Sequence, residues 1–324
     1  MRVCITGGTG SLGQALTYHF LRQWADRVVV FSRDELKQAV MCREIEAQFP
    51  GVGPQIRMFL GDVRNRRRMV KAFHGCDVVV HAAALKRVDA VACHMGEIKA
   101  TNIDGTENVI DAALEAGVGK VLLISSDKAV EPTNAYGASK QMAEHLAIGA
   151  NSITYPQGTR VSVLRYGNVL GSRGTVVHLW RQQVAAGQPI KLTHWEMTRF
   201  WITLQQACEL VTAVLEQMDG GEIFVPQLPA LELRTLAQAI GGPGYNIEIM
   251  GLRPGGEKIH ETLLSSDELP RTEVVRTGLM IPPHFMSWSG RITRGLPRPP
   301  TPYTSATAGR LTIENMRGLL ADVP

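Results

Sequence analysis

The segment RVCITGGTGSLG (residues 2–13) decides the fold of this chain. It begins as a short apolar strand, passes through a glycine-rich turn and continues into a helical pattern over 12–23. The glycines at 7, 10 and 13 allow a tight turn, a close approach of the backbone to a phosphate, and close packing of the helix on the strand. Free N–H groups at the start of a helix bind phosphates. The segment therefore predicts the pyrophosphate site of a dinucleotide-binding domain.

Apolar strands and amphipathic helices alternate through the first half of the chain. We expect strands at 2–5, 27–31, 56–60, 77–81, 119–125 and 159–165, and helices at 12–23, 34–48, 64–73, 97–116 and 136–150. This alternation predicts an α/β fold with a doubly wound parallel sheet of the Rossmann type. Later segments are richer in Gly and Pro and have shorter strands. We therefore expect a dinucleotide-binding Rossmann domain over 1–167, and a smaller C-terminal substrate-binding lobe over 168–324 with segments that return to the first domain.

The stretch VLLISSDKAVEPTNAYGASK (residues 121–140) combines a buried strand with reactive side chains. Tyr136 and Lys140 are four residues apart, so a helix places them on one face, one turn apart. A lysine ammonium there favours the phenolate, and Tyr136 can then exchange a proton well below its ordinary pKa of about 10. Ser126 can hold an alcohol by hydrogen bond. This is the proton half of an alcohol oxidation, and a bound nicotinamide supplies the other half.

The end of the second strand indicates which nicotinamide cofactor is bound. In dinucleotide-binding domains this strand ends beside the adenosine ribose, where an acid accepts from a free 2′-hydroxyl and a cation accommodates a 2′-phosphate. Ser32, Arg33 and Lys37 favour NADP. Asp34 is a competing signal for NAD, although an acid is equally favoured in the first turn of the next helix. We expect NADP.

Composition excludes several classes of function. The chain has 324 residues, 44% of them hydrophobic, so it can bury a large core. It has no apolar run long enough to span a membrane and no signal peptide, and its five scattered cysteines fit reduced thiols, so we expect a cytoplasmic protein. The histidines show no metal-ligand spacing. The arginine cluster at 64–68 is interpreted as a solvated helix face, and we expect no nucleic-acid partner.

A set of sequence blocks spread over nearly the whole chain carries a family resemblance. The blocks are ITGGTGSLG (5–13), FSRDELKQ (31–38), FLGDVR (59–64), HAAALKRV (81–88), TNIDGTENVI (101–110), SSDKAVEPTNAYGASK (125–140), RYGNVLGSRGTVV (165–177), MTRFWIT (197–203), GGEIFVP (220–226) and, more loosely, GLRPGGEKIHETL (251–263) and PYTSATAGRLT (302–312). Together they resemble the extended short-chain dehydrogenase/reductase superfamily. Within it they resemble the inverting UDP-N-acetylglucosamine 4,6-dehydratases, polysaccharide biosynthesis enzymes of the pseudaminic acid pathway type.

The resemblance implies a reaction in which NADP oxidises carbon 4 of the sugar while Tyr136 takes the hydroxyl proton. The ketone acidifies the hydrogen on carbon 5, and Lys128 removes it. That step requires a neutral amine, so burial or a neighbouring cation must lower the pKa of Lys128. Asp127, holding a proton, protonates the departing hydroxyl of carbon 6, to which the hydride returns. A proton delivered to the opposite face of carbon 5, through Lys128, inverts that carbon.

The resemblance also implies the residues of the site. The catalytic residues are Ser126, Asp127, Lys128, Tyr136 and Lys140. The residues expected to bind NADP are Gly7, Thr9, Gly10, Ser11, Leu12, Gly13, Ser32, Arg33, Asp34, Glu35, Leu36, Lys37, Asp62, Val63, Ala82, Lys86, Tyr136, Lys140 and Val169. The residues expected to bind UDP-N-acetylglucosamine are Lys86, Ser125, Ser126, Asn168, Arg173, Arg199, Arg253 and Glu257. No metal site is expected, and the family forms homo-oligomers, dimers or larger.

Two departures from the family pattern concern the site. Position 126 is Ser where the family usually has Thr, which keeps the hydroxyl and removes a methyl. The family's usual Arg-Pro-Gly-Glu-Lys has an extra glycine here, so that Pro-Gly-Gly separates Arg253 from Glu257. The expected substrate contact of Glu257 is the assignment that this insertion affects most. A basic, proline-rich arm near 291–300 has no clear family counterpart.

Three alternatives stay open. A UDP-sugar 4-epimerase on the same scaffold needs Tyr136 and Lys140 but no Asp-Lys pair, so the pair favours the dehydratase. A retaining 4,6-dehydratase would give the other stereochemistry at carbon 5. A redox-sensing regulator would bind NADP without turnover, and such proteins often lose the Tyr or the Lys that this chain keeps.

Overall fold

The fold is built around one large sheet of nine strands in the order β14-β15-β10-β6-β5-β4-β1-β2-β3. It is seen in a computed structural model that describes residues 1–23, 25–86, 93–154, 158–253, 255–283, 301–321 and 323. The strands are β1 (Arg2–Thr6), β2 (Arg27–Ser32), β3 (Ile56–Leu60), β4 (Val78–His81), β5 (Lys120–Ile124), β6 (Arg160–Leu164), β10 (Ile223–Val225), β14 (Glu273–Val275) and β15 (Gly278–Ile281). The strands from β3 to β10 are parallel, and β15 and β14 add an antiparallel edge.

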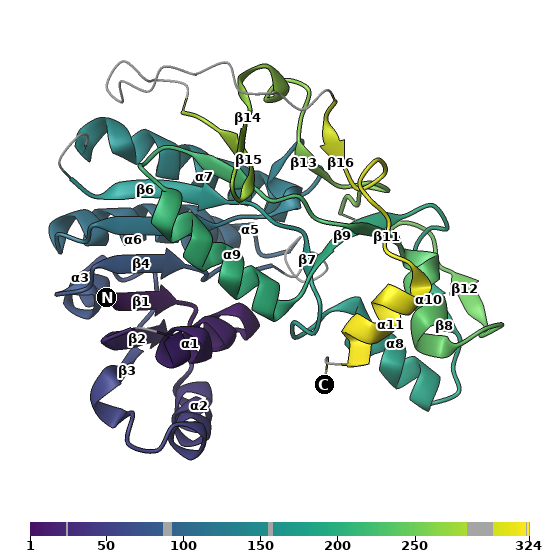
Figure 1. Cartoon of the computed structure of the whole chain (residues 1–324), viewed down its shortest axis with the longest axis horizontal. Coiled ribbons are helices and arrows are strands. Elements are labelled where there is room, and N and C mark those ends of the chain that lie inside the picture. Colours follow the sequence, from purple (N-terminus) through teal and green to yellow (C-terminus); the bar gives the residue numbers. More distant parts are fainter. Residues whose placement is uncertain are drawn as a thin grey trace.

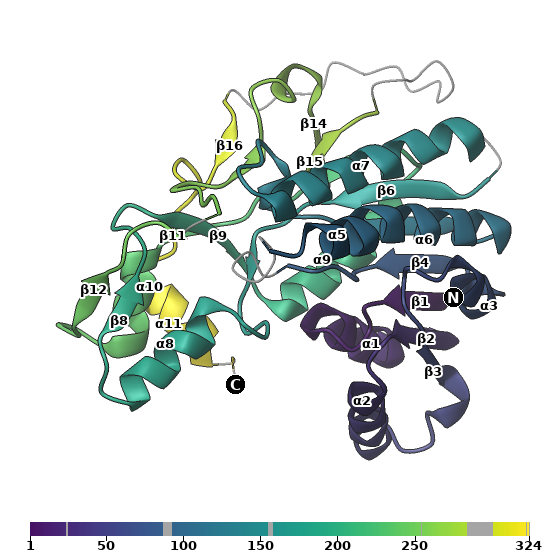
Figure 2. The same cartoon turned by 180° about the vertical axis from the view of Figure 1, so that it is seen from behind.

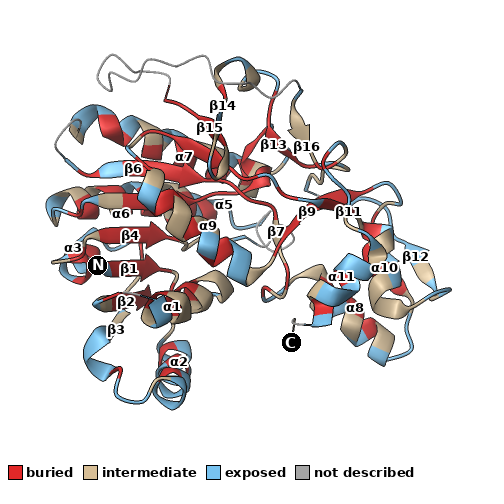
Figure 3. Ribbon diagram, in the orientation of Figure 1, coloured by how far each residue is buried: buried red, intermediate tan, exposed pale blue. Residues whose placement is uncertain are grey.

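Helices cover both faces of this sheet. α1 and α9 lie together on the face seen in Figure 1, and α5, α6 and α7 lie on the face seen in Figure 2. The helices of this part are α1 (Ser11–Gln23), α2 (Glu35–Gln48), α3 (Arg66–Phe73), α5 (Met95–Ile98), α6 (Asp104–Glu115), α7 (Ala135–Thr154) and α9 (Leu204–Gln217). Because both faces are covered, the central strands are continuous apolar runs, and their ribbons are buried along most of their length in Figure 3.

A smaller lobe lies beside the carboxyl ends of the parallel strands (Figure 1). Its sheets pair β11 with β9 and β9 with β7, and β12 with β8. It is built from β7 (Asn168–Val169), α8 (Val176–Ala185), β8 (Ile190–Leu192), β9 (Thr198–Ile202), β11 (Ala230–Glu232), α10 (Leu233–Gly241), β12 (Ile247–Ile249) and α11 (Ile313–Ala321). These elements enclose a second apolar core around Trp180 and Trp201. Later segments also return to the large sheet, since α9 packs on α1 and β10 pairs with β6.

The sequence-based predictions of the first half are confirmed, with one correction. All six expected strands form, and they lie next to one another in the parallel part of the sheet in the order β3-β2-β1-β4-β5-β6. The single helix expected over 97–116 is instead divided into α5, the π-helical turn η2 (Lys99–Ile103) and α6. Asn102 in that turn donates to the carbonyl of Leu85 and accepts from its N–H, at 2.9 and 2.8 Å. Through Asn102, the π-helical turn therefore holds the loop after β4 in place. Such turns are frequent at functional sites.

The remaining elements and expectations concern the periphery. The described residues also form the short 3-10 helices η1 (Gly53–Gln55), η3 (Asp127–Ala129) and η4 (Leu269–Arg271). The strand β13 (Thr262–Leu264) pairs antiparallel with β16 (Tyr303–Thr304), which lies much later in the chain. The arginine cluster is exposed, as expected for a solvated helix face, and Arg66 forms ion pairs with Asp111 and Glu115. Within the described residues no helix has the length and apolarity to cross a bilayer, and no cluster of metal-binding side chains occurs. The arm near 291–300 lies outside the described residues.

Candidate active site

The glycine-rich turn forms a cradle that only glycines can line. Gly7 adopts φ +67°, and a Cβ at this position would lie 2.8 Å from the backbone of Ala83. A Cβ at Gly13 would lie 2.5 Å from the carbonyl oxygen of Gly7, which also accepts from the N–H of Gly10. α1 then starts at Ser11 and Leu12 with its first N–H groups directed at the turn. This arrangement fits a dinucleotide pyrophosphate.

The end of β2 presents cations where the ribose of a dinucleotide is expected. The Arg33 side chain is 55% exposed and lies 3.8 Å from Asp62. Asp34 is the N-cap of α2: it accepts from the N–H of Lys37 at 2.9 Å and forms an ion pair with the Lys37 ammonium at 2.7 Å. Its carboxylate is therefore engaged in capping, the second of the two roles considered for it. Glu35 and Leu36 begin α2, and Ser32 is buried against Gln38.

Two further strand ends border the same edge of the sheet. After β3, burial acts to raise the pKa of Asp62, but its bonds to Arg64 outweigh that effect and hold the pKa below its ordinary value. The following Val63 packs against Gly105. After β4, the N–H of Ala82 donates to Thr6, and burial, together with the nearby Arg173, lowers the pKa of Lys86. These residues lie where the sequence-based reasoning placed cofactor contacts.

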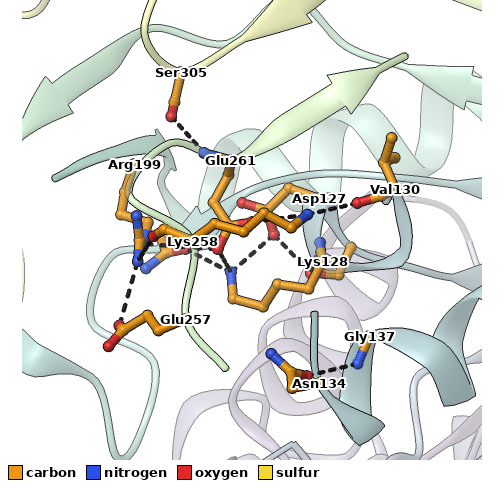
Figure 4. A network of polar contacts seen from close by, with 12 residues as sticks. Asp127, Lys128, Val130, Asn134, Gly137, Arg199, Glu257, Lys258, Glu261 and Ser305 are labelled. Atoms are coloured by element: carbon orange, nitrogen blue, oxygen red, sulfur yellow. Dashed lines mark hydrogen bonds and ion pairs between the residues drawn. The ribbon is translucent and has the colours of Figure 1, made fainter. Parts of the chain in front are cut away.

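The Asp-Lys pair follows β5 on the short helix η3 and is directed into the protein. Asp127 is fully buried, and 24% of the Lys128 side chain is exposed. The Lys128 Nζ lies 2.9 Å from Asp127 Oδ1, 3.3 Å from Asn168 Oδ1 and 3.4 Å from Glu261 Oε1. Ser126 caps η3 and donates to Asp127 at 2.8 Å. Figure 4 shows the pair at the centre of a network that draws on both lobes.

The charges around this pair correct one expectation and agree with another. Burial raises the pKa of Asp127 above its ordinary value, and the charge of Lys128 offsets this only in part. Burial alone would lower the pKa of Lys128, but Asp127 and Glu261 outweigh it and hold that pKa above its ordinary value. The expected lowering of the Lys128 pKa is therefore wrong for the substrate-free protein, because two acceptors with negative charge stabilise its ammonium.

Tyr136 and Lys140 lie one turn apart on α7, but they do not titrate as expected. Burial raises the pKa of Tyr136, and opposing effects of Lys128 and Ser126 reduce this shift without reversing it. Lys140 is buried and donates to the carbonyl of Ile124 at 2.6 Å. Burial lowers its pKa to about 8, with a partial offset from Glu144. A phenol pKa lowered by Lys140 is therefore wrong for this state, because the Lys140 ammonium is desolvated and bonded elsewhere.

The hydroxyl of Ser125 does not line the expected substrate pocket. It donates to Glu144 at 2.5 Å inside the first domain, and Glu144 in turn binds Arg165. The side chain thus belongs to the support of β5 and β6. Arg173 is also displaced from the other arginines, since it contacts Thr9, Ser11 and Gln14 of the glycine-rich turn and α1.

A cavity of about 100 Å³ opens between the Asp-Lys pair and the second lobe. It is lined by Lys128, Thr133, Asn134, Asn168, Arg199, Arg253, Gly256, Glu257, Lys258 and Glu261. Its walls thus bring together five residues that sequence reasoning had selected from four separate segments: Lys128, Asn168, Arg199, Arg253 and Glu257. β7 carries Asn168 and Val169, and β9 carries Arg199 beside it.

Glu257 links the two arginines of this cavity. Its Oε1 lies 2.7 Å from Arg253 Nη2 and 3.3 Å from Arg199 Nη2. The extra glycine is accommodated because Gly255 and Gly256 adopt φ +103° and +91°, and a Cβ on Gly256 would lie 2.1 Å from the carbonyl of Thr133. Asn134 donates to the Gly256 carbonyl at 3.0 Å. The loop is therefore docked on the start of α7 with Glu257 directed at the arginines.

Sequence reasoning missed Lys258 and Glu261. Lys258 donates to the carbonyl of Val130 and lies 3.5 Å from Glu261 Oε2, while the side chain of Glu261 is only 3% exposed. The available signal was a glutamate directly before the apolar Thr262–Leu264, a position where a charge is rarely buried without a partner.

Comparisons with known proteins agree with this geometry. The model of the polysaccharide biosynthesis protein family matches residues 3–282. Among curated relatives, the UDP-N-acetylglucosamine 4,6-dehydratase (inverting) of Campylobacter jejuni is 42% identical over 268 residues, which cover 82% of this chain and 78% of the relative. The UDP-glucose 4-epimerase of Rickettsia conorii is 37% identical over 327 residues, covering 98% of this chain and 94% of the relative.

Solved structures share the fold. Pen from Bacillus thuringiensis superimposes with a TM-score of 0.89 at 33% identity, covering 100% of this chain and 98% of that one. The dTDP-glucose 4,6-dehydratase DesIV from Streptomyces venezuelae, solved with NAD and TYD bound, has a TM-score of 0.69 at 23% identity over 79% of this chain and 86% of its own. The second likeness shows the fold alone.

Proposed function

Because this chain belongs to the polysaccharide biosynthesis protein family, we propose that it is an NADP-dependent UDP-N-acetylglucosamine 4,6-dehydratase that inverts carbon 5. At a coarser level it is an enzyme of the nucleotide-sugar dehydratase and epimerase group within the short-chain dehydrogenase/reductases. Its product would be a UDP-4-keto-6-deoxy-N-acetylhexosamine, UDP-2-acetamido-2,6-dideoxy-β-L-arabino-hex-4-ulose. The expectations of a cytoplasmic homo-oligomer stay predictions.

One observation supports this proposal: the partly exposed Lys128 lines the cavity, and the buried Asp127 lies directly behind it, 2.9 Å from its amine. Dehydration needs an acid for the departing hydroxyl and a base for the carbon 5 hydrogen within reach of one sugar. Asp127, whose pKa is raised by burial, would be the acid. Lys128 would act as the base after its ammonium has lost a proton. The substrate-free site opposes this loss, because Asp127 and Glu261 raise the pKa of Lys128. Epimerisation at carbon 4 needs neither group.

Tyr136, Ser126 and Lys140 would serve the oxidation at carbon 4. Tyr136 takes the hydroxyl proton, and Ser126 holds the same hydroxyl from the end of β5. Lys140 lies one turn along α7, where its amine donates to the carbonyl of Ile124 at the end of β5. The high pKa of Tyr136 in the substrate-free state means that proton removal has to be assisted by charges present only in the complex.

The glycine cradle, the start of α1 and the cations after β2 would hold NADP. When bound, the nicotinamide accepts a hydride from the substrate and returns it. Arg33 and Lys37 suit a 2′-phosphate, and the capping role of Asp34 removes the main argument for NAD. We propose that 1–167 provide this site and that 168–324 mainly provide the substrate lobe.

The arginines would bind the diphosphate of the UDP-sugar. Arg199 and Arg253 both bind Glu257, and their planar guanidinium groups suit a grip on anionic oxygens. Glu257 would also contact the UDP-sugar. Lys86 and Arg173 are near neighbours on the opposite side, at the glycine-rich turn. Asn168 completes the site beside Lys128.

The test is to incubate the purified protein with UDP-N-acetylglucosamine and NADP and to measure the mass of the product. Loss of one water supports the proposal. Solvent deuterium at carbon 5, with proton couplings from NMR, then separates inversion from retention. A retained configuration would leave the dehydratase in place and remove the inverting assignment.

A second function is favoured by one finding. The UDP-glucose 4-epimerase of R. conorii aligns with 98% of the chain, whereas the C. jejuni dehydratase aligns with 82% of it. A UDP-sugar 4-epimerase would return a product of unchanged mass with a new configuration at carbon 4. Unchanged mass with UDP-N-acetylglucosamine and with UDP-glucose, together with a new stereocentre in either, would replace the dehydratase by this function.

A further inference from the structure

Glu261 is a buried carboxylate that neither the sequence reasoning nor the proposed mechanism uses. It lies directly before β13, and its side chain is 3% exposed. Three cations surround it: Lys128 Nζ lies 3.4 Å from Oε1, Arg199 Nε lies 3.8 Å from Oε1, and Lys258 Nζ lies 3.5 Å from Oε2. Within the part of the chain that the structure describes, Oε2 makes no hydrogen bond. A buried carboxylate is stable only if such charges compensate it.

The backbone of Glu261 is fixed by a segment more than forty residues later in the chain. Its N–H donates to the hydroxyl of Ser305 at 2.8 Å, and the N–H of Ser305 donates back to its carbonyl at 2.8 Å. Ser305 is fully buried and also bonds with Thr198, the neighbour of Arg199 on β9. Figure 4 shows Glu261 held from one side by Ser305 and directed at Lys128 on the other.

Glu261 therefore completes the surroundings of the Lys128 amine. Asp127, Asn168 and Glu261 accept from, or form ion pairs with, the same Nζ from three different elements. The other charged or titratable groups that act on Lys128 and Glu261 are Arg199 and Lys258, and Tyr136 lies within the electrostatic reach of both. Arg199 opposes the ammonium of Lys128, and the three cations keep Glu261 ionised despite its burial.

We propose that Glu261 is a positioning residue of the active site: from the segment before β13, its carboxylate holds the Lys128 amine against Asp127 and Asn168 and determines how tightly that amine keeps its proton. The inference rests on the proposed function only where it concerns the reaction. An amine held in this way stays protonated before substrate binds and has a proton available for delivery to carbon 5. The Glu261 charge also makes the deprotonated amine a stronger base.

The first test measures the titration of Lys128 without substrate. Trace acetylation of the full-length protein by acetic anhydride over neutral to alkaline pH, read by peptide mass spectrometry, gives the midpoint for Lys128. Loss of an opposite charge at this distance should lower that midpoint by about 1–3 pH units in Glu261→Gln. Glu261→Asp should restore part of the shift, and Ser305→Ala should give a smaller shift in the same direction because the carboxylate is less firmly held.

Glu222→Gln is the matched control. Glu222 is also a buried glutamate, but it binds Ser162 at 2.7 Å and the turn before β10, away from the cavity. Its replacement should leave the Lys128 midpoint in place even if it reduces thermal stability. Circular dichroism and NADP binding show which variants keep the native fold. A natively folded Glu261→Gln with an unchanged Lys128 midpoint would overturn the proposal and leave Glu261 as a structural counter-ion.

The second test uses the reaction. In the dehydratase assay, the rise of carbon 5 deuterium incorporation with pH should move to lower pH in Glu261→Gln, in step with the Lys128 midpoint. A rise that stays at the wild-type pH would contradict the role of Glu261 in the reaction. If the wild type releases no water from UDP-N-acetylglucosamine, the proposed function fails, while the acetylation experiment still decides the role of Glu261 at Lys128.

Discussion

Two ionic clusters contact or include residues of the segment 125–128, and they differ in how completely their polar atoms are hydrogen-bonded. In the Arg165 cluster (Arg165, Glu144 and Glu268), the guanidinium binds both carboxylates at 2.6–3.2 Å, and Ser125 also binds Glu144. In the Lys128 cluster (Asp127, Lys128 and Glu261), Asp127 Oδ2 and Glu261 Oε2 are buried and make no hydrogen bond to any described residue.

The difference teaches where chemistry can occur in this fold. Buried polar atoms are normally hydrogen-bonded, so atoms left without a partner mark either strain or a place for a ligand. Both clusters border a cavity, the Lys128 cluster the one of about 100 Å³ and the Arg165 cluster a separate one of about 240 Å³. In the Arg165 cluster, however, α7, β6 and the segment after β13 supply partners for both carboxylates. We interpret the first as functional and the second as structural.

Lys128→Ala should give the largest effect on activity. Loss of a general base reduces rates by about 10²–10⁴-fold, so water loss should fall by that factor. Slow reduction of NADP should persist, because oxidation at carbon 4 precedes removal of the carbon 5 proton. Product mass and absorbance of reduced nicotinamide measure the two steps. Lys71→Ala on the exposed side of α3 is the control. Equal loss in both steps would mean that Lys128 does not act as the base.

Arg165→Met should instead show its effect in stability. Removing one partner from a buried ion pair costs about 3–5 kcal/mol, because Glu144 and Glu268 are left as uncompensated buried charges. Urea denaturation measures the loss. Arg160→Met is the control, since its exposed pair with Asp219 at 3.4 Å should contribute about 0–1 kcal/mol. A similar small loss for both would show that the Arg165 cluster is not a structural support.

Lys140 lies between the two clusters, and its titration can be read from the pH dependence of folding. Its pKa is about 8 in the folded protein against an ordinary value of 10.5, so between these values the unfolded chain binds more protons. Stability should therefore rise with pH across this window, by at most about 1.4 kcal/mol per pH unit. Lys140→Met should lack this rise in urea denaturation, and Lys71→Met should keep it. A rise that survives in Lys140→Met would assign it to another group.

Arg33→Ser should give the smallest effect of these variants, a weaker binding of NADP. It tests whether the exposed Arg33 side chain, 3.8 Å from Asp62, binds the 2′-phosphate. A hydrogen bond to a charged group contributes about 1.5–3 kcal/mol, so NADP should bind about 10–100-fold more weakly while NAD binding changes little. Arg43→Ser, on the exposed side of α2, is the control. Isothermal titration with both cofactors measures the ratio. Equal weakening for NAD and NADP would remove Arg33 from the 2′-phosphate site.

Much of the fold followed from local patterns. The six parallel strands and the turn at Gly7 are local consequences of apolar runs and of backbone freedom at glycine, so the sequence predicted them closely. The break in the helix at 99–103 was missed because its cause, the clamp of Asn102 on Leu85, lies in another segment. Ser125 was expected among the substrate contacts from its match to a family motif, and only the position of Glu144 shows that its hydroxyl is turned into the first domain.

By itself, the sequence determined the parallel sheet, the phosphate-binding turn and the adjacency of an acid and an amine after β5, because each depends on neighbours along the chain. Only the tertiary structure decided the charge state of that amine. Burial and charge act over distances of a few ångströms, and the carboxylate that most alters Lys128 besides Asp127 stands 133 positions later and is held there by Ser305. Proton affinity is thus a property of the assembled site.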